Sequence, residues 1–570
     1  MIRLVVNGNP LDLPSNLKIP IKRQNPAYLG QDAGVIKGSF SYPFSLPLTP
    51  ANRAALNYPD RIDSAEVPAQ ELPASLYVGP DLLLKGSLTV AKPNRNTVKV
   101  YLISNPLKDL TKVKMNEADQ GSVSAADEAA LALMMKDTTT NPFGYDAIFA
   151  PIYNIALRDD LDKVPAEAHF HNAWHFDDQV FTVGNHVTPL PRVAPILKRA
   201  VEAAGYTFDD GLHVTDEMRR QVLVNNRSLK YDNQLSTRMP LNLCLPNITV
   251  AEFLKSLCRT YCLATFSSLT GDHIDLVPLR SLVRAAPRKD WTAYAAHNYS
   301  RDPDASAVSR YTWGDSANAQ TYFFAEWSND FNDPDYARRD FLDDDTEEEV
   351  PVHRNQLAYY YSRAAVSIRK KIKGLLGFVF LNSFGYIDNN RSGDTVTPTV
   401  PPAQTNYLHF FPSSNDKTVM ATMAATPVGI ETAAIVIPEE FGEITSESGD
   451  VVASLSFYRG MQFSRSGQLY PMLSHFPYTT NQVYIEGEIT SLSWLGPNGL
   501  YEQWWKEWDG MLRESAGVER TFTLPLVELL GFDFKDKVRV ENRNYFVRSI
   551  EFSVGVDGVT PAKCELVSVS

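Results

Sequence analysis

The segment from Thr249 to Pro278 constrains the fold most, because it combines a helix signature with an immediate strand pair. Thr249 and Glu252 match a capping box, in which each side chain satisfies a backbone N–H of the first helical turn. Apolar residues then recur at the spacing of one buried helix face: Val250, Phe253, Leu254, Leu257, Cys258 and Tyr261. A strand pair, 264–267 and 273–278, follows through Thr270-Gly271-Asp272. This order predicts an α+β domain.

The first hundred residues predict an antiparallel meander. Ile2, Leu4 and Val6 alternate before an Asn-Gly turn, and three β-rich runs (74–78, 82–90 and 97–103) are separated by Gly/Pro/Asn turns. Proline cannot donate to a strand ladder. The segment 40–47, with Pro43 and Pro47, is therefore expected to be an edge segment or an extended arm.

The last fifty residues also alternate, which predicts a C-terminal β-barrel or sandwich. The alternating apolar positions are Val538, Val540, Phe546, Ile550, Phe552 and Val554. Together these patterns predict an α+β, mostly β chain, with several β-barrel or sandwich domains and a small helix-containing α+β domain.

Three further helices are expected. One spans 124–136, with Ser124 as N-cap, and another spans 194–204, with Gly205 as a left-handed C-cap. The third covers 499–513 and carries an aromatic stripe at i, i+3, i+4 and i+7: Tyr501, Trp504, Trp505 and Trp508. Such a stripe is typical of a helix packed into a core or a subunit interface, and less often of a sugar-stacking platform.

Composition shifts divide the 570 residues into six predicted segments. Residues 383–450, rich in Asn, Gly, Thr, Pro and Ala, are interpreted as an insertion or long loop. The predicted segments are an N-terminal β domain (1–110), a helix-containing excursion (111–185), an α+β domain (186–300), a β-rich segment (301–382), the insertion (383–450) and a C-terminal β domain with the aromatic helix (451–570).

Charge and cysteine content exclude some classes of protein. With 67 acidic and 54 basic side chains, the net charge of −13 argues against a protein that coats nucleic acid. Four cysteines are too few for a disulfide framework and are expected to be buried thiols. We expect no signal peptide, synthesis in a cytoplasm and no stable membrane insertion, because the longest apolar stretch (374–381) is far shorter than about 18 residues.

No established catalytic motif is present. The sequence contains no GxSxG, GxxxxGK[ST], GxGxxG or HExxH pattern. His169, His171 and His175 have metal-like spacing, but no single regular element presents all three, so aromatic and polar strand residues are the favoured interpretation. Residues 330–335 resemble a calcium loop only in composition. We therefore expect no catalytic, cofactor-binding or metal-binding residues, no cofactor, and no enzymatic activity.

Five stretches, taken in order, resemble structural proteins in the tail modules of phages and prophages of Bacteroidota-type bacteria. None of the five is a catalytic signature, so the resemblance depends on their order. The stretches are 37–47 with Thr49 and Asn52, then 246–257, 455–460, 493–504 and 538–569. The wider architecture is similar to the tail or baseplate hub family, in which β-barrels and small α+β domains assemble, usually as trimers, into a ring that closes the tail tube above the tip.

This resemblance implies a virion protein of the tail tip or baseplate that contacts copies of itself and other tail and baseplate proteins. Five residues are candidates for subunit contacts: Tyr42, Phe44, Trp504, Trp505 and Trp508. DNA would pass through the ring without specific binding. An acidic lumen suits that passage, and the run 343–349 is either such a lining or a solvated loop.

Two alternatives remain open at this stage. A tail-borne glycan- or receptor-binding protein would use exposed indoles such as Trp494, Trp504 or Trp505 to stack on sugars. A tail-associated cell-wall hydrolase would need paired carboxylates across a cleft, or a zinc ion at His169, His171 and His175.

Overall fold

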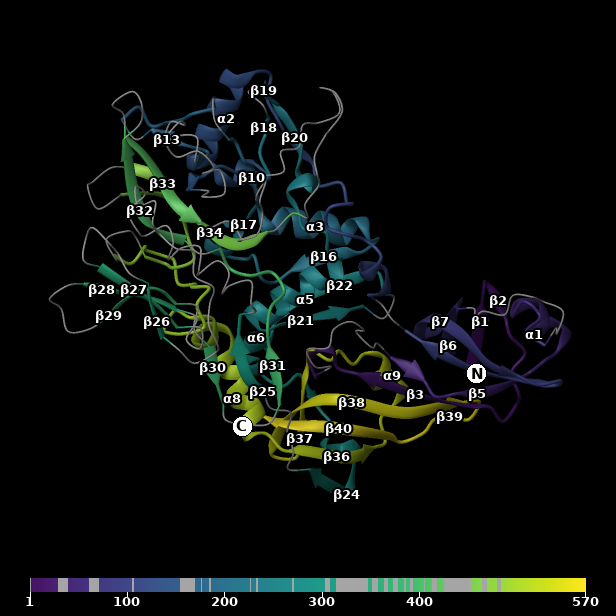
Figure 1. Ribbon diagram of the computed structural model, residues 1–570. Helices are drawn as coiled ribbons and strands as arrows, with labels where there is room; N and C mark the ends of the chain where they lie inside the picture. The colour runs from purple at the N-terminus through teal and green to yellow at the C-terminus, as the bar shows by residue number, and fades with distance from the viewer. Residues whose placement is uncertain are drawn as a thin grey trace.

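The computed structural model contains a large antiparallel sheet, several small sheets and a few helices (Figure 1). The α+β, mostly β class is thereby confirmed. The structure describes residues 2–569 except 29–38, 61–70, 105–106, 154–169, 176, 184–185, 226, 232–233, 269–270, 303–307, 314–346, 351–356, 363–366, 373–377, 384–385, 390–392, 404, 413–417, 425–450, 452, 464–468 and 479–482.

The predicted α+β unit is present in the middle of the chain. Helix α5 (Val250–Tyr261) begins with the complete Thr249–Glu252 capping box and ends at Cys262, whose φ of 49° is left-handed. Strands β21 (Leu263–Ser267) and β22 (His273–Pro278) pair antiparallel, and β16 (Thr207–Asp210) adds to β22 in parallel. Helix α3 (Val193–Ala203), close to its predicted bounds, packs with α5 in the same hydrophobic core.

The N-terminal meander is also confirmed. Its strands are β1 (Ile2–Val6), β6 (Glu71–Val78), β7 (Asp81–Pro93) and β8 (Thr97–Ile103), and each pairs antiparallel with the next. Asn7 and Gly8, both with positive φ, form the turn from β1 into β2 (Asn9–Pro10). Strand β5 (Phe44–Pro47) pairs only with β8 within the described chain, as expected of an edge, whereas β4 (Phe40–Ser41) bridges β8 and β3 (Lys18–Gln24).

The expected C-terminal barrel is wrong in one respect, because the described strands do not close into a barrel. The C-terminal strands are β36 (Gly517–Phe522), β37 (Lys537–Val540), β38 (Arg543–Gly555), β39 (Gly558–Val559) and β40 (Ala562–Val569). Strand β3 pairs along β38 from Lys18↔Gly555 to Gln24↔Ser549. The N- and C-terminal regions therefore extend one sheet instead of each closing on itself.

A bent segment of the chain brings the C-terminal part of the sheet partway toward a closed barrel. Strand β23 (Lys289–Asp290) pairs with β37, and β24 (Ala295–Asp302) pairs with β36. A short 3-10 turn at Thr292–Tyr294 separates them, and the buried Trp291 packs against Phe522 and Phe532. The sheet therefore curves around Trp291, but its ladder of backbone hydrogen bonds is interrupted at the turn.

The first predicted helix starts later than expected. Helix α2 (Glu128–Thr140) is capped by Asp127, whose side chain accepts from the N–H of Ala130 at 2.8 Å. Ser124 belongs instead to β9 (Ser122–Ser124), which pairs with β20 (Arg238–Pro240). The N-cap prediction at Ser124 is wrong because a strand partner more than a hundred residues away holds it extended.

The segments 301–382 and 383–450 contain strands where the structure describes them. Strands β26 (Glu347–Val350), β27 (Leu357–Ser362), β28 (Ser367–Ile372) and β29 (Phe378–Ser383) form one sheet, and β25 (Val308–Thr312), β30 (Tyr386–Asp388) and β31 (Asp394–Val396) form another. Part of the acidic run, 347–349, is thus in a strand, and 343–346 and 330–335 lie outside the described residues.

Two strands of the predicted insertion join a sheet from elsewhere in the chain. Strands β32 (Thr405–Pro412) and β33 (Thr418–Ala424) pair with each other, and β33 also pairs with β11 (Ile152–Tyr153) and β13 (Trp174–His175). The long-loop interpretation is therefore too simple for 405–412 and 418–424. The six domain boundaries themselves remain predictions.

Among the described residues, no helix combines the length and apolarity needed to cross a membrane.

Candidate functional site

The aromatic helix is packed into the chain's own core. One π-helical turn, η9 (Tyr501–Trp505), leads into α8 (Lys506–Glu514), and Trp504, Trp505 and Trp508 are all buried. Trp504 packs edge-on against Tyr261 of α5, with ring centroids 5.1 Å apart, and the Trp505 indole donates to the Arg259 carbonyl at 3.1 Å. The indoles thus join α8 to α5, so a subunit contact here would use the helix's other side.

Trp508, Phe44 and Tyr42 lie near the junction of the N- and C-terminal strands. Trp508 packs on Tyr28 and Phe546, and Phe44 is buried on β5. The half-buried Tyr42 donates its hydroxyl to Glu551 at 3.1 Å, and burial together with this carboxylate raises the Tyr42 pKa. Their role in subunit contacts stays a prediction.

The indoles proposed for sugar stacking are not at the surface. Trp494 is fully buried, with ring centroids 5.6 Å from Tyr311 and 5.8 Å from Trp313. Trp504 and Trp505 are buried as described above. Sugar stacking needs an accessible aromatic face, and none of these three provides one in the folded chain.

The structure brings His171 together with a histidine that sequence spacing did not suggest. His171, on β12 (Phe170–His171), is fully buried, with its ring centroid 5.4 Å from that of His186 and its Nδ1 2.5 Å from Thr188 Oγ1. Burial and the neighbouring His186 hold the pKa of His171 well below its usual range. His169 lies outside the described residues, and His171 and His175 do not meet a third metal-ligating group within the described chain.

A buried ion cluster was missed by sequence reasoning. Arg459, fully buried on β34 (Ser454–Phe463), donates to Glu217 at 2.9 Å, to Glu488, and to the Thr490 carbonyl at 2.7 Å. Glu217 also accepts from the N–H groups of Ile489 and Thr490, and Glu488 accepts from Arg220 at 2.6 Å. The residues that Arg459 contacts in this cluster are all distant from it in the sequence, so no short motif signals the cluster.

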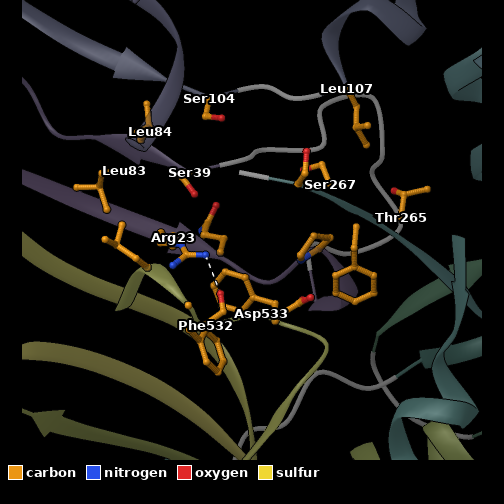
Figure 2. A pocket seen from close by; sticks show the side chains of 17 residues that line it. Arg23, Ser39, Leu83, Leu84, Ser104, Leu107, Thr265, Ser267, Phe532 and Asp533 are labelled. Atoms are coloured by element: carbon orange, nitrogen blue, oxygen red, sulfur yellow. Dashed lines mark hydrogen bonds between the residues drawn. The ribbon is translucent and has the colours of Figure 1, made fainter. Parts of the chain in front are cut away.

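A cavity of about 250 Å³ lies where three segments meet (Figure 2). Arg23 from β3 donates to the carbonyls of Leu529 at 2.5 Å and Phe532 at 3.1 Å. Burial, partly offset by Asp533, lowers the Arg23 pKa to about 10. Leu83 and Leu84 of β7 and Thr265 and Ser267 of β21 form other walls. Because both guanidinium ends bond to main-chain carbonyls, Arg23 acts as a clamp between segments and not as an anion site.

In the ribbon formed by β24 and β36, β36 is mostly half-buried and β24 is an exposed edge of the large sheet. Residues 296–301 of β24 are exposed on both faces, and Tyr299 is 64% exposed. Strand β24 ends the described strand order, so no described strand pairs with its outer edge. An exposed edge of this kind is a template for pairing with another chain.

One group within the described chain has three potential ligands close enough to share a metal ion. Asp209, His273 and Asp275 offer ligand atoms that all lie within 4.8 Å of one another. His273 Nε2 is 2.7 Å from Asp275 Oδ1 and 3.2 Å from Asp209 Oδ2. The exposed Asp209 and the half-buried His273 and Asp275 leave this position open to solvent. Sequence reasoning missed this group because its ligands come from two separate strands.

No protein-family profile matches the chain, and no curated protein matches it. Two solved structures align over nearly all of it. One is the 43 kDa tail protein of prophage MuSo2 from Shewanella oneidensis, with TM-score 0.32, 9% identity, and coverage of 99% of this chain and 97% of that one. The other is the tail protein from Neisseria meningitidis MC58, with TM-score 0.31, 7% identity, and coverage of 99% and 95%. At these TM-scores and identities, the likeness carries no argument about function.

Proposed function

We propose that this chain is a non-enzymatic structural protein of a phage tail. We further propose that it is the hub, which oligomerises as a trimer, closes the tail tube and connects it to the tip. Its partners would be copies of itself and neighbouring tail and baseplate proteins, and DNA would pass through the ring without specific binding. The five sequence stretches that resemble tail proteins are the starting point.

The structure supports treating those five stretches as one framework. All five contribute side chains to one continuous hydrophobic core. Tyr42, from the first stretch, also bonds to Glu551 in the last. A scaffold whose distant segments share one core is rigid enough to present a fixed assembly surface.

The exposed β24–β36 ribbon is the observation that carries the assembly proposal. A strand with both faces and one edge in water gains little from its own chain, because its side chains bury almost no apolar surface. Pairing with a second chain would satisfy the backbone groups at the edge and bury Tyr299. A ring of head-to-tail contacts needs two complementary surfaces on each protomer, and this edge would be one of them.

Light scattering on the purified full-length chain tests the assembly. We expect the mass of three chains, and closed rings in negative-stain images. Tyr299→Glu places a charge on the exposed edge and should weaken assembly about tenfold, a cost of about 1.4 kcal/mol. Leu133→Glu is the matched control, because Leu133 is 69% exposed on the distant helix α2.

A chain that stays monomeric, even when mixed with neighbouring tail proteins, would contradict the hub. Antibody labelling of intact particles tests the location separately, and labelling away from the tail would contradict the wider tail role.

A further inference from the structure

We propose that Asp209, His273 and Asp275 form a binding site for a divalent transition-metal ion of the zinc class. The site is independent of the tail role, since it depends on these side chains alone. Imidazole nitrogen and carboxylate oxygen are ligands that zinc accepts, and zinc sites with three protein ligands keep the fourth position for water.

The backbone places all three ligands on one face of a small sheet. In the parallel pair β16–β22, Asp209 lies directly opposite Asp275, and Thr207 lies opposite His273. Because side chains alternate along a strand, residues 207, 209, 273 and 275 point the same way. The intervening Ile274 and Leu276 are buried on the other face, in the hydrophobic core. Ligands on paired strands are held more precisely than ligands on loops.

Thr207 fixes which nitrogen of His273 faces the carboxylates. The Thr207 hydroxyl lies 2.7 Å from His273 Nδ1 and 3.1 Å from the Asp272 carbonyl, so it holds this ring nitrogen by a hydrogen bond. The contact turns Nε2 toward Asp209 and Asp275. Hydrogen bonds to the ring nitrogen that does not bind the metal orient the histidine ligands of metal sites in the same way.

The position between Nε2 and the two carboxylates suits a metal ion that takes the place of a proton. Without metal, an Nε2–H donates to Asp275 at 2.7 Å, and a metal ion that binds Nε2 displaces that proton. Tetrahedral zinc with bonds near 2.1 Å separates its ligand atoms by about 3.4 Å. The 3.2 Å between Nε2 and Asp209 is close to this separation, and the Asp275 carboxylate moves back from its hydrogen-bond distance to admit the ion.

Residues from the C-terminal region complete the surroundings. Lys535 Nζ lies 2.5 Å from Asp275 Oδ2 and 3.2 Å from Asp533 Oδ2. Lysine thus holds the oxygen of Asp275 that does not face His273, and it leaves Oδ1 for the metal. Three carboxylates and one ammonium give a local charge of about −2 with neutral His273, which attracts a divalent cation.

Calorimetric titration of zinc chloride into the chelator-stripped, full-length protein tests the site. We expect one zinc ion per chain, and weaker binding of calcium and magnesium, which prefer all-oxygen ligands. His273→Gln and Asp209→Asn should each weaken zinc binding at least tenfold. Thr207→Val, which removes the hydroxyl that holds Nδ1, should weaken it about 10- to 100-fold.

Two control variants distinguish this site from zinc binding elsewhere on the chain. Glu128→Gln and Asp216→Asn alter two exposed carboxylates on helices outside this sheet, and they should leave zinc affinity unchanged. X-ray absorption at the zinc edge should show only nitrogen and oxygen neighbours, which excludes the four cysteines as ligands. Circular dichroism of each metal-free variant checks that it folds.

No stoichiometric zinc binding, or unchanged affinity in the folded His273→Gln variant, would overturn the proposal. Either result would make the cluster a hydrogen-bonded group without a metal. Neither result bears on the tail role, which is tested by assembly and location.

Discussion

Two charged clusters of similar composition differ in how completely their polar atoms are paired. In the buried cluster, Arg459 contacts two carboxylates and a carbonyl, and Glu217 receives two further main-chain N–H groups. In the half-exposed cluster, the two carboxylates of Asp209 and Asp275 converge on one imidazole nitrogen. The first cluster is paired within itself except at Arg459 Nε, whereas the second leaves its three potential ligands open to solvent.

The comparison shows that saturation, and not charge content, distinguishes a structural cluster from a binding site. A buried charge is tolerated only when it is paired and hydrogen-bonded, and the Arg459 cluster is held by ion pairs and hydrogen bonds among its own residues. Exposed charges can remain underpaired at small cost, because water screens them. Perturbing both clusters tests this distinction.

The largest effect is expected from Arg459→Met. This change removes the cation and leaves Glu217 and Glu488 in the interior, with only Arg220 still paired to Glu488. Breaking a buried pair from one side costs about 3–5 kcal/mol. Urea unfolding should show this loss. Arg219→Met, which removes an exposed arginine paired with Asp216, should cost less than about 0.5 kcal/mol and serves as the control.

If Arg459→Met unfolds at the same urea concentration as the control, the buried cluster contributes no more than an exposed pair. The contrast between the two clusters would then be lost.

The second-largest effect is expected from mild acid, which should lower the stability of the protein through a histidine beside the buried cluster. Burial, together with the nearby Arg459 guanidinium, holds the pKa of His475 well below its usual range. Between the unfolded pKa of about 6.5 and the lower folded pKa, the unfolded chain binds a proton that the folded chain does not. Stability should therefore fall by about 1.4 kcal/mol for each pH unit below about 6.5.

The slope of urea midpoints between pH 7.5 and 5.5 measures this loss. In His475→Gln the slope should be shallower by the contribution of one histidine, while the buried His171 keeps its own contribution. An unchanged slope would show that His475 titrates normally in the folded protein.

A smaller effect is expected in the half-exposed cluster. Lys535→Met removes the ammonium from Asp275 and Asp533, but these side chains are partly exposed. Measured ion pairs of this kind contribute about 0.2–1 kcal/mol. A double-mutant cycle with Asp275→Asn in urea isolates that coupling, and a coupling as large as the Arg459 effect would contradict the comparison.

Elements specified by neighbouring residues were predictable, and contacts between distant residues were not. The Thr249 capping box and the apolar stripe of α5 lie within 13 residues, and both were confirmed. The N-cap at Ser124 failed because Arg238 pairs with it from a distant strand. Local alternation predicted strand β38. It gives no information that β3 pairs with β38 and keeps the sheet open.

The candidate sites follow the same rule. The aromatic stripe at Trp504, Trp505 and Trp508 was visible in the sequence, but whether it faced a core or a partner was not. Arg459 and Glu217 are 242 residues apart, and the metal-ligating group joins two strands on either side of α5. A single sequence gives spacing along the chain, whereas these sites depend on which strands become neighbours.

The pairing of β3 with β38 also sets the order in which the protein can be made. The ribosome synthesises residues 18–24 more than 500 residues before residues 549–555, so β3 has no partner on this edge until that later segment has been made. Contacts of such long sequence separation form slowly and expose unpaired strands to aggregation in the meantime. A nascent chain, or one shortened before β38, therefore carries an open strand edge that the finished protein conceals.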